Sequence, residues 1–548
     1  MLSVRELFGI WLVVVLAIVG PALRRRIARG RALRNIPTVP GGHWLGGHIP
    51  KWFNSEHGLS YQAAAFERLG RVFRLNGVLR DPQLVISDPA ALTHILVKES
   101  ENFELPSWFI TGNWAVFGPS VVTITGAHHR NQRKLLTPVF SEKNLRRMHP
   151  QLQLAAIQLK EFLAERAEAG YESVNMLDAF MRLTLECIGR AGFGYAFNNL
   201  TGEEDHPYLG ALKDFAPTYA NVLPDGALGI GISTHHLPIW VLRAGLRLFS
   251  FVRPSLIDIL KNVETINTEL TRIWKEKNRL FAKGDEATVK QLQEDTDLLS
   301  VCWRANRAQN LKNRIPEEEV LAHIRVTMFA GADTTSAALS RAAQMLAEHQ
   351  DVQDALREEI INAGATALTD PGSLPLLDAV VKETLRLFPP AQVSQRAPLA
   401  DAVLPLQHPI IGSDGARIDS LHVPAGTHIL INIRGANCDP TIWGPDAHLW
   451  KPSRWLSGLP QSVADARGPG VYAHLMTFLG GSRSCIGFRF SQLVMKTTLA
   501  TIIPSFHFAP GEQEVTWRYF GVLSPGVKSG HASPDLPLRV TLLRGDTA

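Results

Sequence analysis

Cysteine is scarce in this chain, and its few copies are poorly placed for pairing. The 548 residues include four cysteines, Cys187, Cys302, Cys438 and Cys485, and none of them forms a CxxC pair. A disulfide framework or a zinc site needs closer spacing, so both are disfavoured, and the pattern fits a reducing compartment. The chain also contains no internal repeat and no low-complexity tract.

Net positive charge is lacking outside the N-terminal segment. The formal net charge is +5, and residues 1–35 hold seven arginines and one glutamate, so a net −1 remains for residues 36–548. A nucleic-acid binder spreads basic charge over its folded part, so nucleic acid is not expected as a partner. The content of 45% hydrophobic and 20% charged residues is ordinary for a globular protein with a large core.

An apolar run precedes the N-terminal arginines. Residues 7–23 carry no charge and are at the short limit for a membrane span. A cleaved signal peptide would have its positive charge before the run and a small-residue site after it. Here the arginines follow the run, so we expect an uncleaved anchor with a luminal N-terminus and a cytosolic body. Residues 36–50 begin with prolines and glycines and predict a stiff hinge.

The remaining chain predicts a mainly α fold with a small β-sheet region. Residues 70–89 alternate apolar and polar side chains around a turn at residues 80–82, which indicates a β-hairpin. Pro316 and three following glutamates predict the start of a helix that continues to about residue 349. Residues 103–124 are aromatic and loop-like, and they fit a satellite hydrophobic cluster as well as a substrate-lining loop.

One stretch near the C-terminus carries most of the chemical information: Phe478-Leu-Gly-Gly-Ser-Arg-Ser-Cys485-Ile-Gly487. Its glycines allow the backbone to approach a flat or bulky group. Arg483 and the N-terminus of a helix that starts at Ile486 or Gly487 would favour a thiolate. A buried structural cysteine in a glycine turn is the alternative reading.

This stretch resembles the haem-binding loop of the cytochrome P-450 family, F-x-x-G-x-R-x-C-x-G. The resemblance implies that Cys485 is the axial thiolate ligand of a haem b iron. It also implies that Phe478 packs near the sulfur, that Arg483 reaches a haem propionate, and that Gly487 belongs to the haem contact.

A second motif, Ala330-Gly331-Ala-Asp333-Thr334-Thr335, lies in the middle of the long predicted helix. A mid-helix glycine costs about 1 kcal/mol relative to alanine, and threonine pairs can loosen a helix. A flat cofactor against Ala330 and Gly331 would explain both features. The motif resembles the family's A/G-G-x-D/E-T-T/S, which implies that Thr334 holds a proton-donating water and that Asp333 relays protons from solvent.

Further positions extend the resemblance. His129 and Arg133 are four residues apart and share one helix face. They correspond to the family's W-x-x-x-R pair, which bonds a propionate, with histidine in place of tryptophan; a solvated basic face is the alternative. Arg396, in a strand-like run, would be another propionate partner.

A charged triad is also implied by the family pattern. Glu383 and Arg386 lie three residues apart on one helix face, a spacing that by itself describes an ordinary surface pair. The resemblance makes them the family's E-x-x-R, which forms a buried charged network with a later arginine. In this sequence that arginine is Arg454.

Taken together, the resemblance implies a cytochrome P-450 fold over residues 51–548 behind an N-terminal transmembrane helix. We expect a haem-thiolate monooxygenase that oxidises an apolar small molecule with O₂ and NADPH-derived electrons. NADPH-cytochrome reductase is the implied electron donor, with cytochrome b5 as a second donor, and the endoplasmic reticulum membrane is the implied location. Residues 222–251 predict a second membrane contact.

The sequence style resembles fungal members of secondary metabolism, with terpenoids as the implied substrate class. Two alternatives remain. The first is a reductase-independent haem-thiolate isomerase or dehydratase, against which the intact Thr334 argues. The second is a non-catalytic membrane protein that binds haem or lipid. It would need neither the acid-alcohol pair, Asp333 and Thr334, nor the thiolate loop, residues 478–487.

Overall fold

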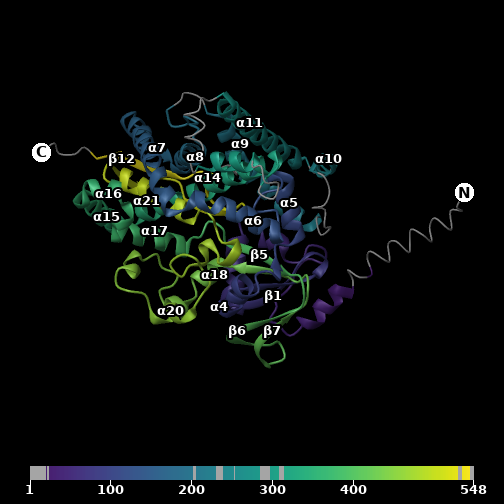
Figure 1. Cartoon of the computed structure of the whole chain (residues 1–548). Coiled ribbons are helices and arrows are strands. Elements are labelled where there is room, and N and C mark those ends of the chain that lie inside the picture. The colour runs from purple at the N-terminus through teal and green to yellow at the C-terminus, as the bar shows by residue number, and fades with distance from the viewer. Residues whose placement is uncertain are drawn as a thin grey trace, which may run out of the picture.

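The computed structural model describes residues 20, 24–201, 205–229, 239–251, 254–283, 297–307, 314–528 and 534–543. Helices dominate this part of the chain (Figure 1). They are α2 (Ile49–Trp52), α3 (Gly58–Leu69), α4 (Pro89–Thr93), α5 (Ser107–Phe117), α6 (Gly126–Leu136), α7 (Glu142–Glu168), α8 (Met176–Phe193), α9 (Pro207–Gly229), α10 (Ile239–Phe249), α11 (Ser255–Lys283), α13 (Leu298–Asn306), α14 (Glu317–Glu348), α15 (Gln350–Ala363), α16 (Ala365–Thr369), α17 (Pro375–Leu387), α18 (Ile433–Asn437), α19 (Pro440–Trp443), α20 (Gln461–Ala466) and α21 (Phe488–Ile502).

The strands form small sheets at the edges of the helical body, so the predicted mainly α fold class is confirmed. One sheet has the order β1-β2-β8-β5-β3, another has the order β4-β12-β9, and β6-β7 and β10-β11 are separate pairs. The strands are β1 (Val72–Asn76), β2 (Pro82–Ile86), β3 (Phe103–Glu104), β4 (Val174–Asn175), β5 (Val393–Pro398), β6 (Ala402–Ile411), β7 (Arg417–Val423), β8 (His428–Asn432), β9 (Phe506–Pro510), β10 (Val515–Tyr519), β11 (Leu523–Val527) and β12 (Pro537–Leu542).

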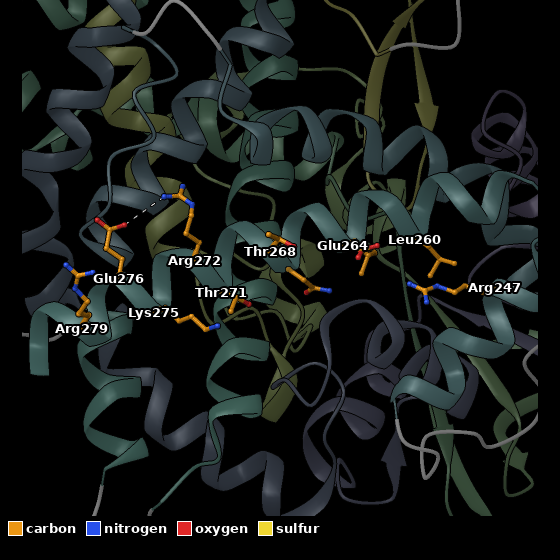
Figure 2. Close-up of a pocket in the computed structure, with 11 residues that line it drawn as sticks. Arg247, Leu260, Glu264, Thr268, Thr271, Arg272, Lys275, Glu276 and Arg279 are labelled. Carbon is orange, nitrogen blue, oxygen red and sulfur yellow. Dashed lines mark ion pairs between the residues drawn. The ribbon is translucent and has the colours of Figure 1, made fainter.

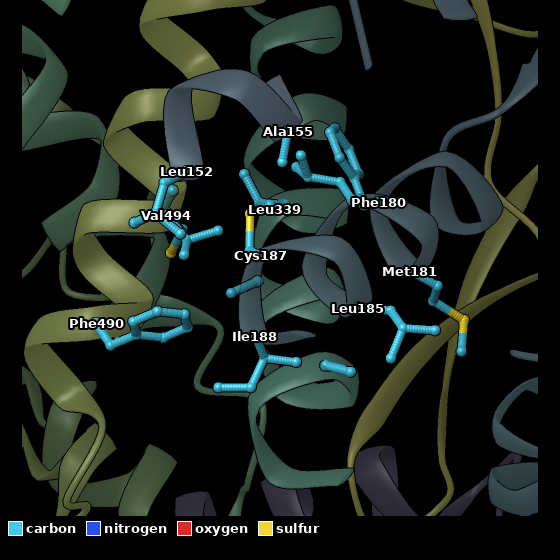
Figure 3. Close-up of a cluster of buried hydrophobic side chains, with 14 of the residues drawn as sticks. Leu152, Ala155, Phe180, Met181, Leu185, Cys187, Ile188, Leu339, Phe490 and Val494 are labelled. Atoms are coloured by element: carbon cyan, nitrogen blue, oxygen red, sulfur yellow. The ribbon is translucent and has the colours of Figure 1, made fainter. Parts of the chain in front are cut away.

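The main core lies where α7, α8, α14 and α21 pack together. Figure 3 shows Phe180 and Cys187 of α8 beside Leu339 of α14, with Leu152 of α7 and Val494 of α21 closing the cluster. All five are almost fully buried, and burial of apolar side chains is the dominant stabilising contribution in such a core. Because α8 packs on α14 at Gly331 and Ala332, this core fixes the part of the helix that carries the Ala330–Thr335 motif.

The predicted hairpin and the long helix are confirmed. β1 pairs antiparallel with β2, and Val72 lies opposite Ile86. The connection is a short 3₁₀ turn at residues 78–80, and Pro82 already belongs to β2. Helix α14 spans 32 residues, with Pro316 as its N-cap and three glutamates in its first turn. The negative charge of these glutamates interacts favourably with the positive end of the helix dipole.

The expectation that residues 103–124 are loop-like was wrong for their central part. Residues 107–117 form α5, with Pro106 at its N-cap and Gly118 after its last turn. The apolar side chains of α5 are spread around the whole helix, so they lack the one-sided periodicity by which a helix is recognised in sequence.

The described part of the basic N-terminal segment packs on the body of the protein. Residues 24–32 are helical, and Leu33 is fully buried in a cluster with Val72 and Ile86. Arg29 forms an ion pair with Asp81, at 2.7 Å between Nη2 and Oδ1. Within the described ranges, no helix is long and apolar enough to cross a membrane, and the anchor predicted at residues 7–23 lies outside those ranges apart from residue 20.

Substitution of Leu33 tests this packing. Because Leu33 is fully buried, Leu33→Ala should lower the free energy of unfolding by about 2–5 kcal/mol. Ile27→Ala, in the same basic segment but 47% exposed, is the matched control and should change it by no more than about 0.5 kcal/mol. Urea unfolding followed by circular dichroism measures both, and equal stability of the two variants would contradict the packing.

Candidate functional site

The loop that carries Cys485 is shaped by close approaches of its backbone. Gly481 has φ of +69°, and a Cβ there would overlap the carbonyl oxygen of Leu96, so a side chain is excluded on both grounds. The Cys485 N–H donates to the Phe478 carbonyl oxygen at 2.9 Å, which closes the loop just before α21. No such overlap exists at Gly487, where a Cβ would have Phe140 Cε1 as its nearest atom, at an ordinary contact distance of 3.8 Å. The surrounding protein would therefore accommodate a side chain at position 487.

Leu479 in this loop adopts a backbone conformation that side chains rarely occupy. Its φ is 56° and its ψ is −166°, a region populated almost exclusively by glycine that costs about 1–3 kcal/mol for other residues. Two backbone hydrogen bonds hold it there, from its N–H to Met476 and from Val471 N–H to its carbonyl oxygen. The sequence carried no signal for this strain, since a leucine between Phe478 and Gly480 looks ordinary.

The Cys485 side chain is exposed within the protein. Its exposed surface faces a cavity of about 300 Å³ between α14, β5, the loop before α6, and the thiolate loop. The cavity joins almost every residue that the sequence assigned to the haem site: His129, Arg133, Ala330, Gly331, Thr334, Arg396, Phe478, Arg483, Cys485 and Gly487. Its apolar walls include Leu105, Phe109, Val121, Val122, Val326 and Ile188.

Positive charge is concentrated on one side of this cavity. Burial lowers the pKa of Arg396 to about 10, and the neighbouring charge of Arg483 acts in the same direction. Burial also lowers the pKa of His129 to about 3, and the nearby arginines, first Arg483 and then Arg133, lower it further. His129 is therefore a neutral imidazole that can still donate one hydrogen bond.

Two partners of these arginines were not foreseen from the sequence. Arg133 Nη2 donates to Ser484 Oγ at 3.2 Å, and Arg483 Nη2 donates to Glu104 Oε2 at 2.8 Å. Glu104 lies in β3, more than 370 residues before Arg483. Neither pair has a sequence spacing that could have indicated it, because only the fold brings these segments together.

The cavity fits a flat apolar group that carries two carboxylates. In the described part of the chain, Glu104 is the one carboxylate that pairs with Arg133, Arg396 or Arg483 at the cavity. Buried cations without partners are costly, so this excess of positive charge favours a dianionic ligand. Burial raises the pKa of the Cys485 thiol, while the Gly487 N–H and Arg133 act in the opposite direction. A cation at the sulfur would favour the thiolate.

The middle of α14 forms the wall opposite Cys485. Thr334 Oγ1 donates to the Ala330 carbonyl oxygen at 2.7 Å, the back-bonding expected of a mid-helix threonine. A Cβ on Gly331 would lie 3.2 Å from Ile188 Cγ1 of α8. Close packing of α14 on α8 therefore supplies a reason for this glycine that the sequence interpretation, based on a cofactor alone, had missed.

Asp333 lies on a different cavity from its neighbour Thr334. Asp333 lines a space of about 710 Å³ between α8, α9, α11 and β11, together with Asp178, Lys213 and Lys261. Burial raises the pKa of Asp333 to about 6. The pair predicted to handle protons therefore straddles α14, with the carboxyl group on one side and the hydroxyl group on the side of Cys485.

The structure brings Glu383, Arg386 and Arg454 together. Arg386 and Glu383 are fully buried and form two parallel hydrogen bonds of 2.8 and 2.9 Å. Arg454 is 3.5 Å from Glu383 but only 2.7 Å from Asp446, so its nearer carboxylate partner is one that the sequence analysis did not include. Trp455 Nε1 also donates to Glu383, at 2.9 Å.

A groove of about 930 Å³ lies away from Cys485, along α11. Figure 2 shows its lining, with Arg272 and Glu276 of α11 3.9 Å apart and Arg247 contributed by α10. The groove is larger than the Cys485 cavity, but its lining mixes arginines, lysine and glutamates and contains none of the residues singled out in the sequence. Its volume alone gives it no chemical role.

Comparison with known proteins agrees with this site. Residues 37–525 match the family model for cytochrome P-450. The chain is 39% identical over 525 residues to cytochrome P-450 monooxygenase 219 of Postia placenta, with 94% of each chain covered. It is 36% identical to ganoderic acid synthetase of Ganoderma lucidum, over 93% of this chain and 94% of that one. It is 34% identical, over 95% of each chain, to the monooxygenase eriI of Hericium erinaceus.

The chain belongs to the cytochrome P-450 family. It is a cytochrome P-450 monooxygenase whose relatives include fungal enzymes of secondary metabolism. Membership implies a haem whose iron is bound by a cysteine thiolate, and the charge and shape of the Cys485 cavity fit that group.

The raised pKa of Asp333 predicts a pH-dependent contribution to stability. The folded chain holds the Asp333 proton more tightly than the unfolded chain, so this contribution is fully present below about pH 4 and is lost as the pH rises through about 6. Asp333→Asn should therefore raise the free energy of unfolding at pH 7.5 by roughly 1–3 kcal/mol and flatten its decline between pH 4 and 6.

Thermal unfolding of the purified protein across this pH range measures the effect. Asp214→Asn is the matched control, since Asp214 is an exposed carboxylate on the same cavity. An unaltered slope in Asp333→Asn would show that the Asp333 carboxyl group is solvated in the folded protein.

Proposed function

We propose that this chain is a haem-thiolate monooxygenase that adds oxygen to an apolar small molecule, with O₂ as oxidant and electrons from NADPH by way of NADPH-cytochrome reductase. Cytochrome b5 is a second candidate donor. The observation that carries this proposal is the single cavity that joins the Cys485 sulfur, an excess of buried arginine charge and the Ala330–Thr335 face of α14.

In this proposal, Cys485 supplies the thiolate ligand of the iron. Arg133, Arg396 and Arg483, with the neutral His129, would bond the two propionates, whose negative charge would balance the buried positive charge. Ala330, Gly331 and Phe478 provide flat or apolar contact surface. When bound, the haem supplies oxygen activation, and the thiolate favours cleavage of the O–O bond.

Proton delivery falls to the two residues that straddle α14. The Thr334 hydroxyl faces the Cys485 cavity and can hold a water there, because its own proton is donated to the Ala330 carbonyl oxygen while its lone pairs remain. Asp333, with a pKa near 6, can take a proton from the neighbouring cavity at physiological pH and release it again. The retained hydroxyl of Thr334 favours oxygen activation over a reductase-independent isomerisation or dehydration.

The substrate class is inferred from the cavity walls and the relatives. The walls near Cys485 are apolar, formed by side chains such as Phe109, Val122 and Val326, and suit a substrate without charge. One relative is named a ganoderic acid synthetase. We infer a role in fungal secondary metabolism, with a terpenoid as the substrate.

We infer that the protein is anchored in the endoplasmic reticulum membrane by residues 7–23, with the N-terminus luminal and the catalytic domain cytosolic. A second contact with the bilayer is supported by three exposed side chains at and just beyond α10. Trp240, Leu248 and Phe251 are 70%, 71% and 87% exposed, an unusual amount of apolar surface for one short helix.

The absorption spectrum of the reduced, carbon-monoxide-bound protein tests the haem-thiolate centre. The full chain should give the red-shifted Soret band of a thiolate-ligated haem, and Cys485→Ala should abolish it because the ligand is removed. Cys302→Ala, at a buried cysteine of α13, is the matched control and should keep the band. Persistence of the band in Cys485→Ala would refute the assignment.

The same variants test the reaction when expressed with NADPH-cytochrome reductase in a fungal host. Extracts should contain oxygenated terpenoids with the Cys302→Ala protein and lack them with Cys485→Ala or without the reductase. Products that form without reductase would favour an isomerase or dehydratase.

Membrane fractionation tests the two proposed contacts. A chain without residues 1–23 should still sediment partly with microsomes, and a further change of Trp240, Leu248 and Phe251 to serine should release most of it, because the apolar surface is lost. Serine at Tyr171, Leu399 and Ile411, which are also more than 60% exposed, is the matched control and should leave the distribution unchanged. Complete release by the truncation alone would rule out the second contact.

A further inference from the structure

A chain of side-chain hydrogen bonds runs from the protein surface to the backbone beside the Cys485 cavity. His128 of α6, which is half exposed, lies with its Nε2 3.2 Å from Glu319 Oε1 of α14. Gln132 Nε2 donates to the other oxygen of Glu319 at 3.0 Å, and Gln132 Oε1 lies 3.2 Å from His323 Nε2. His323 Nδ1 is 3.3 Å from the Val121 nitrogen. His323 is fully buried, so these contacts satisfy both of its ring nitrogens.

The donors and acceptors in this chain have one consistent arrangement. The Val121 N–H can only donate, so His323 Nδ1 must accept, and the Gln132 amide group then directs its oxygen toward His323 and its NH₂ toward Glu319. The His323 Nε2 must then carry the hydrogen. Burial lowers the pKa of His323 to about 4, which keeps this neutral tautomer at physiological pH.

Val121 belongs to a wall segment, residues 118–124, between α5 and α6. The side chains of Val121 and Val122 line the Cys485 cavity. Thr123 Oγ1 folds the segment on itself, because it donates to the Gly118 carbonyl oxygen at 2.7 Å and accepts from Ser120 N–H at 2.8 Å. At its far end, Arg483 Nη2 donates to the Ile124 carbonyl oxygen at 2.9 Å. The wall segment is thus tied to the thiolate loop at one end and to α14 through His323.

We propose that His323 is a positioning residue that holds the wall segment against α14 through the Val121 N–H, and so sets the shape of the cavity above Cys485. Gln132 and Glu319 fix the tautomer that this contact requires. His323 is not among the residues that line the Cys485 cavity, so it acts through the position of Val121 and Val122. The consequence for ligands rests on the proposed function, whereas the contact with Val121 does not.

Two amide substitutions distinguish the contributions of the two ring nitrogens of His323. An asparagine oxygen lies close to the position of Nδ1, so His323→Asn keeps an acceptor for Val121 N–H. A glutamine amide lies one methylene further out, near Nε2, so His323→Gln keeps the contact with Gln132 and loses the acceptor. Hydrogen–deuterium exchange should show the Val121 amide exchanging about tenfold faster in His323→Gln and within about twofold of the unaltered protein in His323→Asn.

The ferric holoenzyme supplies a second measurement with two iron-binding probes of different size. In His323→Gln, 4-phenylimidazole should bind about tenfold more weakly because its ring loses a fixed wall, and imidazole, which is too small to reach it, should change less than about twofold. In His323→Asn both affinities should stay within about twofold. His149→Leu is the control for loss of a partly buried histidine, since His149 contacts Thr497 of α21 away from the cavity.

Equal exchange rates of the Val121 amide in His323→Asn and His323→Gln would overturn the inference. An equal loss of affinity for 4-phenylimidazole and imidazole in His323→Gln would also overturn it. If His323→Gln does not fold, Gln132→Met gives the same test, because it removes the acceptor that fixes the tautomer and should speed Val121 exchange at least about threefold. If no azole shifts the spectrum of any variant, the proposed function fails, and the exchange rates still decide the role of His323.

Discussion

The burial of positive charge around the Cys485 cavity is the constraint on which the rest of the structure depends. Arg133, Arg396 and Arg483 reach the cavity from α6, β5 and the thiolate loop, and Glu104 is the carboxylate found beside them in the described residues. Such an arrangement is unfavourable without an anion, since desolvated cations cost several kcal/mol each. A dianionic cofactor, such as the haem that membership of the family implies, would complete the charge balance. The apo protein should therefore be less stable than the cofactor-bound form.

Helix α14 gives the site its second organising element. It is held rigidly by α8, through the packing of Ile188 on Gly331 and the hydrogen bond from Thr184 Oγ1 to the Ala332 carbonyl oxygen. Because neighbouring side chains of an α-helix point about 100° apart, Asp333 lines one cavity and Thr334 the other. The same helix contacts the wall segment through His323, so one element carries both the residues predicted to handle protons and the proposed positioning residue.

Local signals in the sequence predicted the elements whose pattern is periodic and one-sided. The hairpin of β1 and β2 and the limits of α14 belong to this group. Helix α5 was missed because its aromatic side chains surround the helix, so no single face stands out. The partners Glu104 and Ser484 were missed for a different reason, since each comes from a segment more than 350 residues from its arginine. Asp446 lies only eight residues from Arg454, but that spacing is not one of the i, i+3 or i, i+4 spacings that mark a helical ion pair. The strain at Leu479 has no compositional signature at all.

The sequence by itself determined the family, the cysteine at the centre of the site and the residue types around it, because a thiolate, cationic groups and an acid-alcohol pair require particular side chains in a particular order. The tertiary structure alone decided which of these meet. It placed His129 and three arginines on one cavity and Asp333 on another. It also brought His323 within hydrogen-bonding distance of Val121, 202 residues away in sequence. The physical reason is that hydrogen bonds and charge interactions act over a few ångströms of space, whatever the distance along the chain.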